Sequence, residues 1–372
     1  MNVLGGNRRC QAALPWAGRS ITDLYKPNPS SLTYPTGDAT IVNDCTNEAT
    51  SGQSLCKRLP VRDTRARGLF RYTAFAALVA AVAQVTLGGI VRVTGSGDAC
   101  PDWPLCYGKL IPPLEYHIVL EYSHRLSATL VGLIVLAVVI LAWRHYRTNR
   151  PVLFASISGG LLVIAAALLG GLTVLSELTW WIRLIHLSIA ELVVASIALA
   201  WLGSRGEVAV PKEALAYAPR YGKWVVWLVV VGVFVLILYG GYMVGVSYGS
   251  SCVTWPHCNG SMAPRGLPFE IHMGHRYLTV ILGMIFVFAA YIGWRKGIVY
   301  SEMRGVIIFM LLIFVAQVIV GAFTVWTGFA IALKVAHLSL ATLMWLSAVV
   351  FAVMYLFPGR YGIKTSLGSA GH

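Results

Sequence analysis

YTAFAALVAAVAQVTLGGIV, residues 72–91, is a run of 20 residues without one charged side chain. About 20 apolar residues in a helix cross the roughly 30 Å hydrocarbon core of a bilayer, so this stretch is typical of a transmembrane helix. Seven further segments meet or approach this length, and none shows the alternation of a membrane β-strand. The sequence therefore predicts an all-α integral membrane protein. The eight expected spans are residues 69–91, 118–143, 152–175, 182–202, 224–246, 271–294, 305–327 and 332–357.

The composition excludes a water-soluble globular fold. Of the 372 residues, 57% are hydrophobic and only 12% are charged, whereas soluble domains carry about 25% charged residues. The formal net charge of +14 would suggest a nucleic-acid ligand in a soluble protein. Here we interpret it as a membrane-insertion signal, and no nucleic-acid partner is predicted.

Lys and Arg divide unequally between the two sides of the expected spans. Seventeen lie in residues 58–71 at the start of the first span, in every second connection after it and behind the last span, whereas five lie on the other side. Because Lys and Arg accumulate in cytoplasmic loops, both termini are predicted to be cytoplasmic in a multi-pass protein of the cell membrane. The five outer basic residues are Arg92, Lys109, Arg183, Arg265 and Lys334.

Five segments are expected along the chain. Residues 1–67 form a polar cytoplasmic tail, rich in Pro, Ser, Thr, Asn and Gly, that is predicted to be disordered. A transit peptide is the less favoured interpretation of its Arg-rich start. Residues 68–204 and 223–358 each form a bundle of four spans, joined by a cytoplasmic linker at 205–222 and followed by a cytoplasmic tail at 359–372.

The second half of the chain repeats the first. Residues 88–106 and 240–258 both contain Gly-Gly followed at the same offset by Cys-x-x-Trp-Pro-x-Cys. Because each half has an even number of spans, the halves are expected to share one orientation as parallel repeats, forming two packed four-helix bundles. Three later landmarks recur in the same order: 123–125 with 274–276, 170–174 with 321–325, and 185–188 with 336–339.

Four histidines lie near the starts of even-numbered spans, all expected at one depth near the outer leaflet. Haem iron takes two axial ligands on opposite faces of a flat macrocycle, and one His from each of two facing helices meets that need. A zinc or copper site would want three or four clustered ligands. The alternative for each histidine is a structural role, as a hydrogen-bonded polar side chain between two helices. The expected haem-iron ligands are His124 and His186 in the first half, and His275 and His337 in the second.

Charged residues beside these histidines could take part in chemistry. Arg125 and Arg276 directly follow their histidines, and each could bind a haem propionate or simply extend to the membrane interface. Glu121 lies three residues before His124, on the same helix face, whereas His272 takes the corresponding place in the second half. A carboxylate beside an iron could shuttle protons or stabilise a cationic transition state. Solvation at the interface is the alternative for Glu121.

Glu191 is a second acidic residue within an expected span. It follows His186 by five residues and therefore points to another face of the helix, and Thr342 is its counterpart in the second half. It could join a proton path, but a hydrogen bond to a neighbouring helix is the favoured interpretation.

Two pairs of cysteines lie in loops predicted to be outside. An oxidising compartment permits one disulfide in each loop, Cys100–Cys106 and Cys252–Cys258. The pairs could be redox-active, or they could clip each loop into a lid. A shared zinc site is disfavoured because the pairs belong to different bundles. The three cysteines of the N-terminal tail, which would be reduced thiols in the cytoplasm, are Cys10, Cys45 and Cys56.

These motifs together resemble haem A synthase. The resemblance rests on residues 88–97 (GGIVRVTGSG), the Cys-x5-Cys loop, residues 121–125 (EYSHR) and the Ile-His-Leu-Ser motif, and covers about residues 68–358. The paired loop cysteines look like the bacterial type of the family. The resemblance implies an eight-span fold with haem b in the C-terminal half and haem O in the N-terminal half.

The resemblance also implies a role for each site residue. His275 and His337 would ligate the haem b cofactor. Arg276, from its place beside His275, is expected in the same binding site. His124 and His186 would hold the substrate haem O, and Glu121 would be the catalytic carboxylate. Arg125 is the candidate for the substrate propionate.

The activity implied is oxidation of the C8 methyl of haem O to a formyl group through successive hydroxylations, giving haem A for terminal oxidases. Expected partners are membrane lipid, a haem O synthase and a haem–copper oxidase in assembly, with a possible homo-oligomer. The alternative is a bis-haem b electron-transfer protein, which would keep haem b in both sites. A haem transporter is a third possibility, and a prenyltransferase is disfavoured because no Asp-x-x-x-Asp motif lies on a loop.

Overall fold

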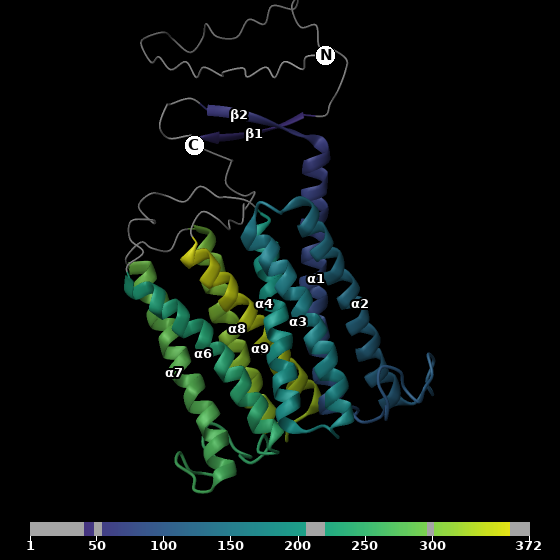
Figure 1. Ribbon diagram of the computed structural model, residues 1–372. Helices are drawn as coiled ribbons and strands as arrows, with labels where there is room; N and C mark the ends of the chain where they lie inside the picture. The colour runs from purple at the N-terminus through teal and green to yellow at the C-terminus, as the bar shows by residue number, and fades with distance from the viewer. Residues whose placement is uncertain (1–40, 48–53, 206–219, 296–300, 358–372) are drawn as a thin grey trace, which may run out of the picture. The chain divides into compact units, whose positions relative to one another are not determined.

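The computed structural model describes residues 41–47, 54–205, 220–295 and 301–357. In these residues it contains eight helices long and apolar enough to cross a membrane (Figure 1). The prediction of an all-α membrane fold with eight spans is therefore confirmed. The helices are α1 Val61–Val93, α2 Tyr116–His145, α3 Arg150–Leu175, α4 Trp180–Gly203, α6 Arg220–Gly245, α7 Leu267–Arg295, α8 Ser301–Trp326 and α9 Ile331–Leu356.

The chain divides into two compact units, Met1–Leu69 and Phe70–His372. The described part of the first unit contains two antiparallel strands, β1 (Ile41–Asn47) and β2 (Ser54–Pro60), whose register places Cys45 opposite Cys56. These strands lie in the segment predicted to be disordered. That prediction rested on polar composition and did not consider the β-branched residues of β1, which favour strands. Of the segments with expected roles, residues 1–40 with Cys10, 206–219 of the linker and 359–372 lie outside the described residues.

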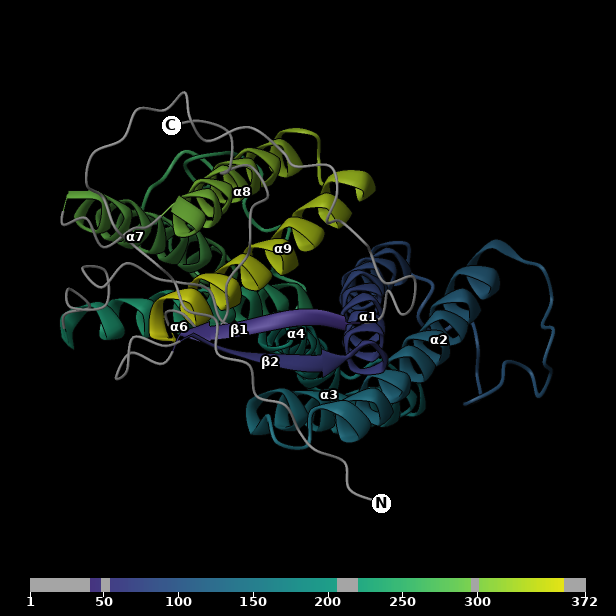
Figure 2. The same cartoon turned by 90° about the horizontal axis from the view of Figure 1, so that it is seen from above.

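In the second unit, α6–α9 close a four-helix bundle, because α6 contacts α7 and α9 and α8 contacts both of its chain neighbours. In the first half α3 packs between α2 and α4. Helix α1 joins them through ring contacts of Phe70 with Tyr146 and of Phe75 with Trp201. Helix α4 also contacts α6 and α9, so the halves meet along α4 (Figure 2).

Glycines let the two halves approach closely, as small residues do between membrane helices. A Cβ built on Gly89 of α1 would lie 2.5 Å from Cδ2 of Leu338 in the other half. A Cβ built on Gly241 of α6 would lie 2.9 Å from Cδ1 of Leu184 and 3.3 Å from Cδ2 of Leu187. A leucine side chain of the opposite half therefore occupies the space beside the second glycine of residues 88–89 and of residues 240–241.

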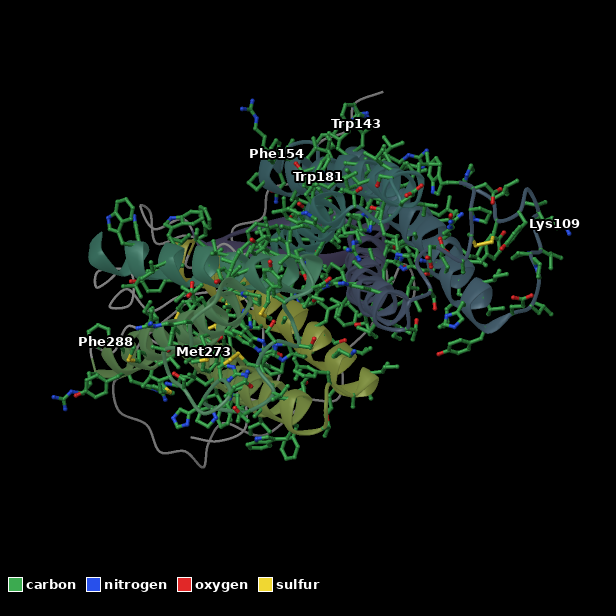
Figure 3. The ribbon with its side chains drawn as sticks, turned by 90° about the horizontal axis from the view of Figure 1, so that it is seen from below. Lys109, Trp143, Phe154, Trp181, Met273 and Phe288 are labelled. Atoms are coloured by element: carbon green, nitrogen blue, oxygen red, sulfur yellow. A yellow bond between two sulfur atoms is a disulfide. The ribbon has the colours of Figure 1, made fainter. Side chains whose placement is uncertain are left out.

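Large apolar side chains cover the outer faces of the helices. Trp143, Phe154 and Phe288 are exposed and point away from the helices (Figure 3). In a soluble protein such a surface would be unstable, whereas in a bilayer it faces hydrocarbon of equal polarity. The chain is therefore a multi-pass membrane protein.

Candidate functional site

The four histidines occupy equivalent positions in the two halves. His124 and His275 are each the ninth residue of their helices, α2 and α7. His186 and His337 are each the seventh residue of α4 and α9. Since the helices begin at corresponding places in the duplication, each half has one ligand candidate on its second helix and one on its fourth.

The pair in the C-terminal half fits a metal ion bound from two opposite sides. The ring centroids of His275 and His337 are 6.5 Å apart, and the ring planes are inclined by 63°. Two imidazoles that share one metal through bonds of about 2.0–2.1 Å have centroids roughly 6 Å apart. Both Nδ1 atoms are buried and form no hydrogen bond of normal geometry, although the backbone carbonyl of Gln317 lies beside the ring of His337.

A cavity of about 740 Å³ is lined by both of these histidines. This volume falls in the range of about 300–1,000 Å³ that is usual for cofactor pockets. Within the described residues, no group of three or more His, Cys, Asp or Glu side chains is arranged to hold a metal ion. A pair of imidazoles facing an apolar cavity therefore suits a metal carried in a macrocycle better than a bare ion.

His124 and His186 form the corresponding pair in the first half, on α2 and α4. Nδ1 of His186 is buried without a hydrogen bond of normal geometry, and the backbone carbonyl of Ala166 lies beside that ring. Nδ1 of His124 instead lies 3.0 Å from the amide Nε2 of Gln84. Gln84 was not predicted as a site residue. Its place four residues before Gly88, on the same face of α1, is the signal that could have found it.

Each of the four rings packs against a glycine of the preceding helix. A Cβ at any of these glycines would approach Cε1 of the ring to 3.4 Å or less. The glycines belong to the Gly-Gly and Gly-x-x-Thr-Val motifs of the duplication, so those motifs make room for the imidazoles. The pairs are Gly88 with His124 (2.9 Å), Gly170 with His186 (3.4 Å), Gly240 with His275 (3.2 Å) and Gly321 with His337 (3.1 Å).

Glu121 is buried and is held by the first disulfide loop. Its Oε2 accepts a hydrogen bond from the backbone N–H of Cys100 at 2.8 Å, and its Oε1 pairs with Arg125 Nη2 at 2.5 Å. The same guanidinium donates to the backbone carbonyls of Asp102 and Leu105, each at 2.5 Å. In this structure Arg125 is therefore engaged with the loop, and a propionate would have to compete for it.

The second half repeats this arrangement with a histidine in place of the glutamate. The backbone N–H of Cys252 lies 3.3 Å from Nδ1 of His272, and Arg276 Nη2 lies 3.4 Å from its Nε2. Arg276 Nη1 donates to the carbonyls of Thr254, Pro256 and His257 at 2.9–3.1 Å. Both arginines thus fasten a loop to a helix, a role that sequence reasoning missed. Arg276 also lines the cavity. That it binds a haem propionate stays a prediction.

The two predicted disulfides, Cys100–Cys106 and Cys252–Cys258, are present. Each encloses a cis Trp-Pro peptide bond. The first loop lies over its bundle, because a Cβ built on Gly171 of α3 would lie 2.7 Å from the indole of Trp103. The disulfides therefore hold compact caps at one end of each half.

Asp102 orders the end of the first cap. The backbone N–H of Gly108 donates to one of its carboxylate oxygens at 2.7 Å, and that of Tyr107 to the other at 2.6 Å. The hydrogen bond from Gly108, supported by that from Tyr107, holds the pKa of Asp102 below its ordinary value.

Basic residues without a described acidic partner also lie at this end of the molecule. Arg92 of α1 and Lys334 of α9 line the cavity, and the charge of Arg92 interacts repulsively with that of Arg183. Nε of Arg183 is buried without a hydrogen-bond partner. Sequence reasoning used these three residues only to count loop charges.

Glu191 lies on the boundary between the halves. Its Oε1 accepts a hydrogen bond from Thr342 Oγ1 at 2.7 Å, and its backbone oxygen accepts one from Trp345 Nε1 at 2.8 Å. Both partners are on α9, so the favoured interpretation, a hydrogen bond to a neighbouring helix, agrees with the structure. Oε2 is buried without a partner.

Comparison with known proteins gives a consistent result. A family model described as cytochrome oxidase assembly protein matches residues 71–118 and 114–350. The heme A synthase of Alkalihalophilus pseudofirmus is 27% identical over 277 residues, which is 72% of this chain and 91% of the relative. That of Lysinibacillus sphaericus is 28% identical over 309 residues, 79% of this chain and 98% of the relative. That of Halalkalibacterium halodurans is 27% identical over 275 residues.

Proposed function

The chain belongs to the family of cytochrome oxidase assembly proteins, and from this premise we propose that it is a haem A synthase. The reaction is oxidation of the C8 methyl of haem O to a formyl group. The observation that carries the proposal is the presence of two histidine pairs at equivalent positions with different neighbours. An enzyme with one resident haem and one substrate haem needs two similar sites that differ in reactive groups.

We assign the resident haem b to the C-terminal half, with His275 and His337 as its ligands. The 6.5 Å separation of their rings and the cavity that they line support this assignment. When bound, the haem supplies one-electron transfer. Arg92 and Lys334 are the cavity cations without a described partner, and they are suited to its propionates.

We assign the substrate haem O to the N-terminal half, between His124 and His186, with Glu121 as the catalytic carboxylate. Its position one turn from His124 puts an acidic group on the ligand's side of α2. Fixed by Cys100 and Arg125, the carboxylate is held ready to accept a proton or to stabilise positive charge, without reorganisation of solvent. In this proposal Arg125 holds the carboxylate of Glu121 in place and binds a propionate only if it leaves the loop.

The cellular setting follows from the same assignment. The protein lies in the cell membrane with both termini in the cytoplasm, and its caps face the oxidising side, where disulfides persist. Haem O synthase supplies the substrate, and a haem–copper oxidase receives the product. A homo-oligomer is compatible with the apolar outer faces.

Pigment analysis of the purified protein tests the proposal. Haem extracted from the protein is identified by mass, and haem O or haem A should accompany haem B. Haem B alone, from cells that make haem O, would support the bis-haem electron carrier instead. An N-terminal half that holds haem B permanently would therefore refute the synthase assignment.

A further inference from the structure

His124 differs from the other three ligand candidates because a side chain holds its Nδ1 atom. The amide Nε2 of Gln84 lies 3.0 Å from that atom. Nδ1 of His186, His275 and His337 is buried without a hydrogen bond of normal geometry. Among the described residues, His124 is thus the one ligand candidate whose Nδ1 is held by a side chain.

The surroundings of Gln84 determine which atom donates. Its Nε2 also donates to the backbone oxygen of His124 at 2.9 Å, and its Oε1 accepts from the hydroxyl of Ser127 at 2.5 Å. Turning the amide over would place its oxygen against the carbonyl oxygen of His124, and two acceptors repel each other. Nε2 of Gln84 therefore faces the ring as a donor, so Nδ1 accepts and the neutral ring carries its proton on Nε2.

The second half lacks this arrangement. Leu236 takes the place of Gln84 in the duplication, and Leu278 takes the place of Ser127. Neither leucine can form a hydrogen bond, so Nδ1 of His275 is free to carry the ring proton. The glycine beside the ring is common to both halves. The ring of His275 also stacks on Tyr239, whose place in the first half is taken by Leu87, but the polar pair is the difference that reaches the ring nitrogen.

We propose that Gln84, oriented by Ser127, makes His124 a displaceable ligand by keeping the ring proton on Nε2. Iron binds a ring nitrogen through its lone pair, with the proton on the other nitrogen. For Nε2 of His124 to bind, the proton has to move to Nδ1, and Gln84 has to give up its hydrogen bond there. His275 loses no hydrogen bond when it binds.

This proposal rests on the proposed function and explains how one fold treats two haems differently. A substrate has to leave as product, whereas a resident cofactor has to stay. The loss of one hydrogen bond weakens binding roughly five- to tenfold. Gln84 is therefore a positioning residue that acts through His124.

The first test uses haem-free protein with the wild-type Gln84. Nitrogen NMR of haem-free protein labelled with ¹⁵N-histidine should show His124 with Nε2 protonated and Nδ1 accepting a hydrogen bond. The His124→Gln variant identifies the signal by its disappearance. A His124 ring with its proton on Nδ1 would overturn the proposal, whatever pigments the protein contains.

The second test measures the rate at which protein loaded with haem B as probe loses haem to excess apomyoglobin. The wild type should lose the haem of its N-terminal site in a fast phase. Gln84→Leu, which copies the second half, should slow that phase roughly five- to tenfold, and Ser127→Ala should slow it less. A purely structural role predicts the opposite, because a disturbed site loses haem faster.

Thr86→Val is the matched control. Thr86 lies on the same helix and bonds Ser339 Oγ at 2.9 Å, without a hydrogen bond to His124. It should leave the fast phase unchanged. An unchanged or faster loss of haem in Gln84→Leu would overturn the proposal. The assignment as a haem A synthase is tested separately, by the pigment analysis.

Discussion

At the scale of single residues, Glu121 and His272 have the same structural duty with different chemistry. Each receives the N–H of the first loop cysteine and contacts the arginine four residues later. Holding the loop therefore requires an acceptor at this position and does not require a carboxylate. The carboxylate of Glu121 is the feature that only the N-terminal half has.

This equivalence supplies a clean substitution for testing Glu121. Glu121→His should keep the loop and the haem content but abolish haem A formation, because it retains an acceptor and removes the carboxylate. Glu121→Ala should abolish the activity as well and also loosen the loop, since Cys100 N–H and Arg125 lose their partner. Haem A is measured by mass and loop order by the rate of disulfide reduction. Haem A at the wild-type level in Glu121→His would rule out the carboxylate role.

The ligands of the C-terminal site can be tested one at a time. His275→Ala or His337→Ala should remove low-spin haem b from the purified protein, because one imidazole cannot supply two axial ligands. The reduced absorption spectrum measures the loss. His257→Ala, in the exposed part of the second cap, is the control and should keep the spectrum. A spectrum unchanged in either ligand variant would contradict the assignment.

At the scale of elements, most of the fold could be predicted because apolar length and motif spacing are local properties. The eight spans, the duplication and both disulfides followed from residue types at fixed separations. The contacts of Arg125 and Arg276 did not, because which carbonyl a guanidinium reaches depends on how the loop folds back. Gln84 escaped notice for a similar reason, since a lone amide in a span gains meaning only from the ring across the helix interface.

Two glycines on α8 allow the packing of a glycine against the His337 ring to be tested separately from the effect of a Gly→Ala change on helix stability. Gly321→Ala should displace the His337 ring and shift the low-spin haem signal, because a Cβ there would lie 3.1 Å from Cε1. Gly305→Ala on the same helix has nothing within 4 Å of the added carbon and should leave the signal in place. Electron paramagnetic resonance of the ferric protein reads the ligand geometry. Equal spectra for the two variants would show that the glycine does not position the ring.

At the scale of the whole molecule, Glu191 connects the halves inside the membrane. Glu191→Ala should lower the free energy of unfolding by about 2–3 kcal/mol, because it opens a cavity and removes the closer of the two acceptors of the Thr342 hydroxyl. Glu191→Gln keeps an acceptor oxygen for Thr342 and should cost much less. Thermal unfolding in detergent measures both. Equal losses in the two variants would mean that the hydrogen bond contributes little to the joint.

The leucines of one half that fill glycines of the other have a historical consequence. Leu338 packs on Gly89, and Leu184 and Leu187 pack on Gly241, so each repeat supplies leucine side chains that pack on a glycine of the other repeat. A single-copy ancestor would have met this need by pairing with an identical chain about a two-fold axis. Fusion of two such copies would have allowed their sequences to differ. In the proposed function, one half could then specialise in releasing its haem and the other in retaining it.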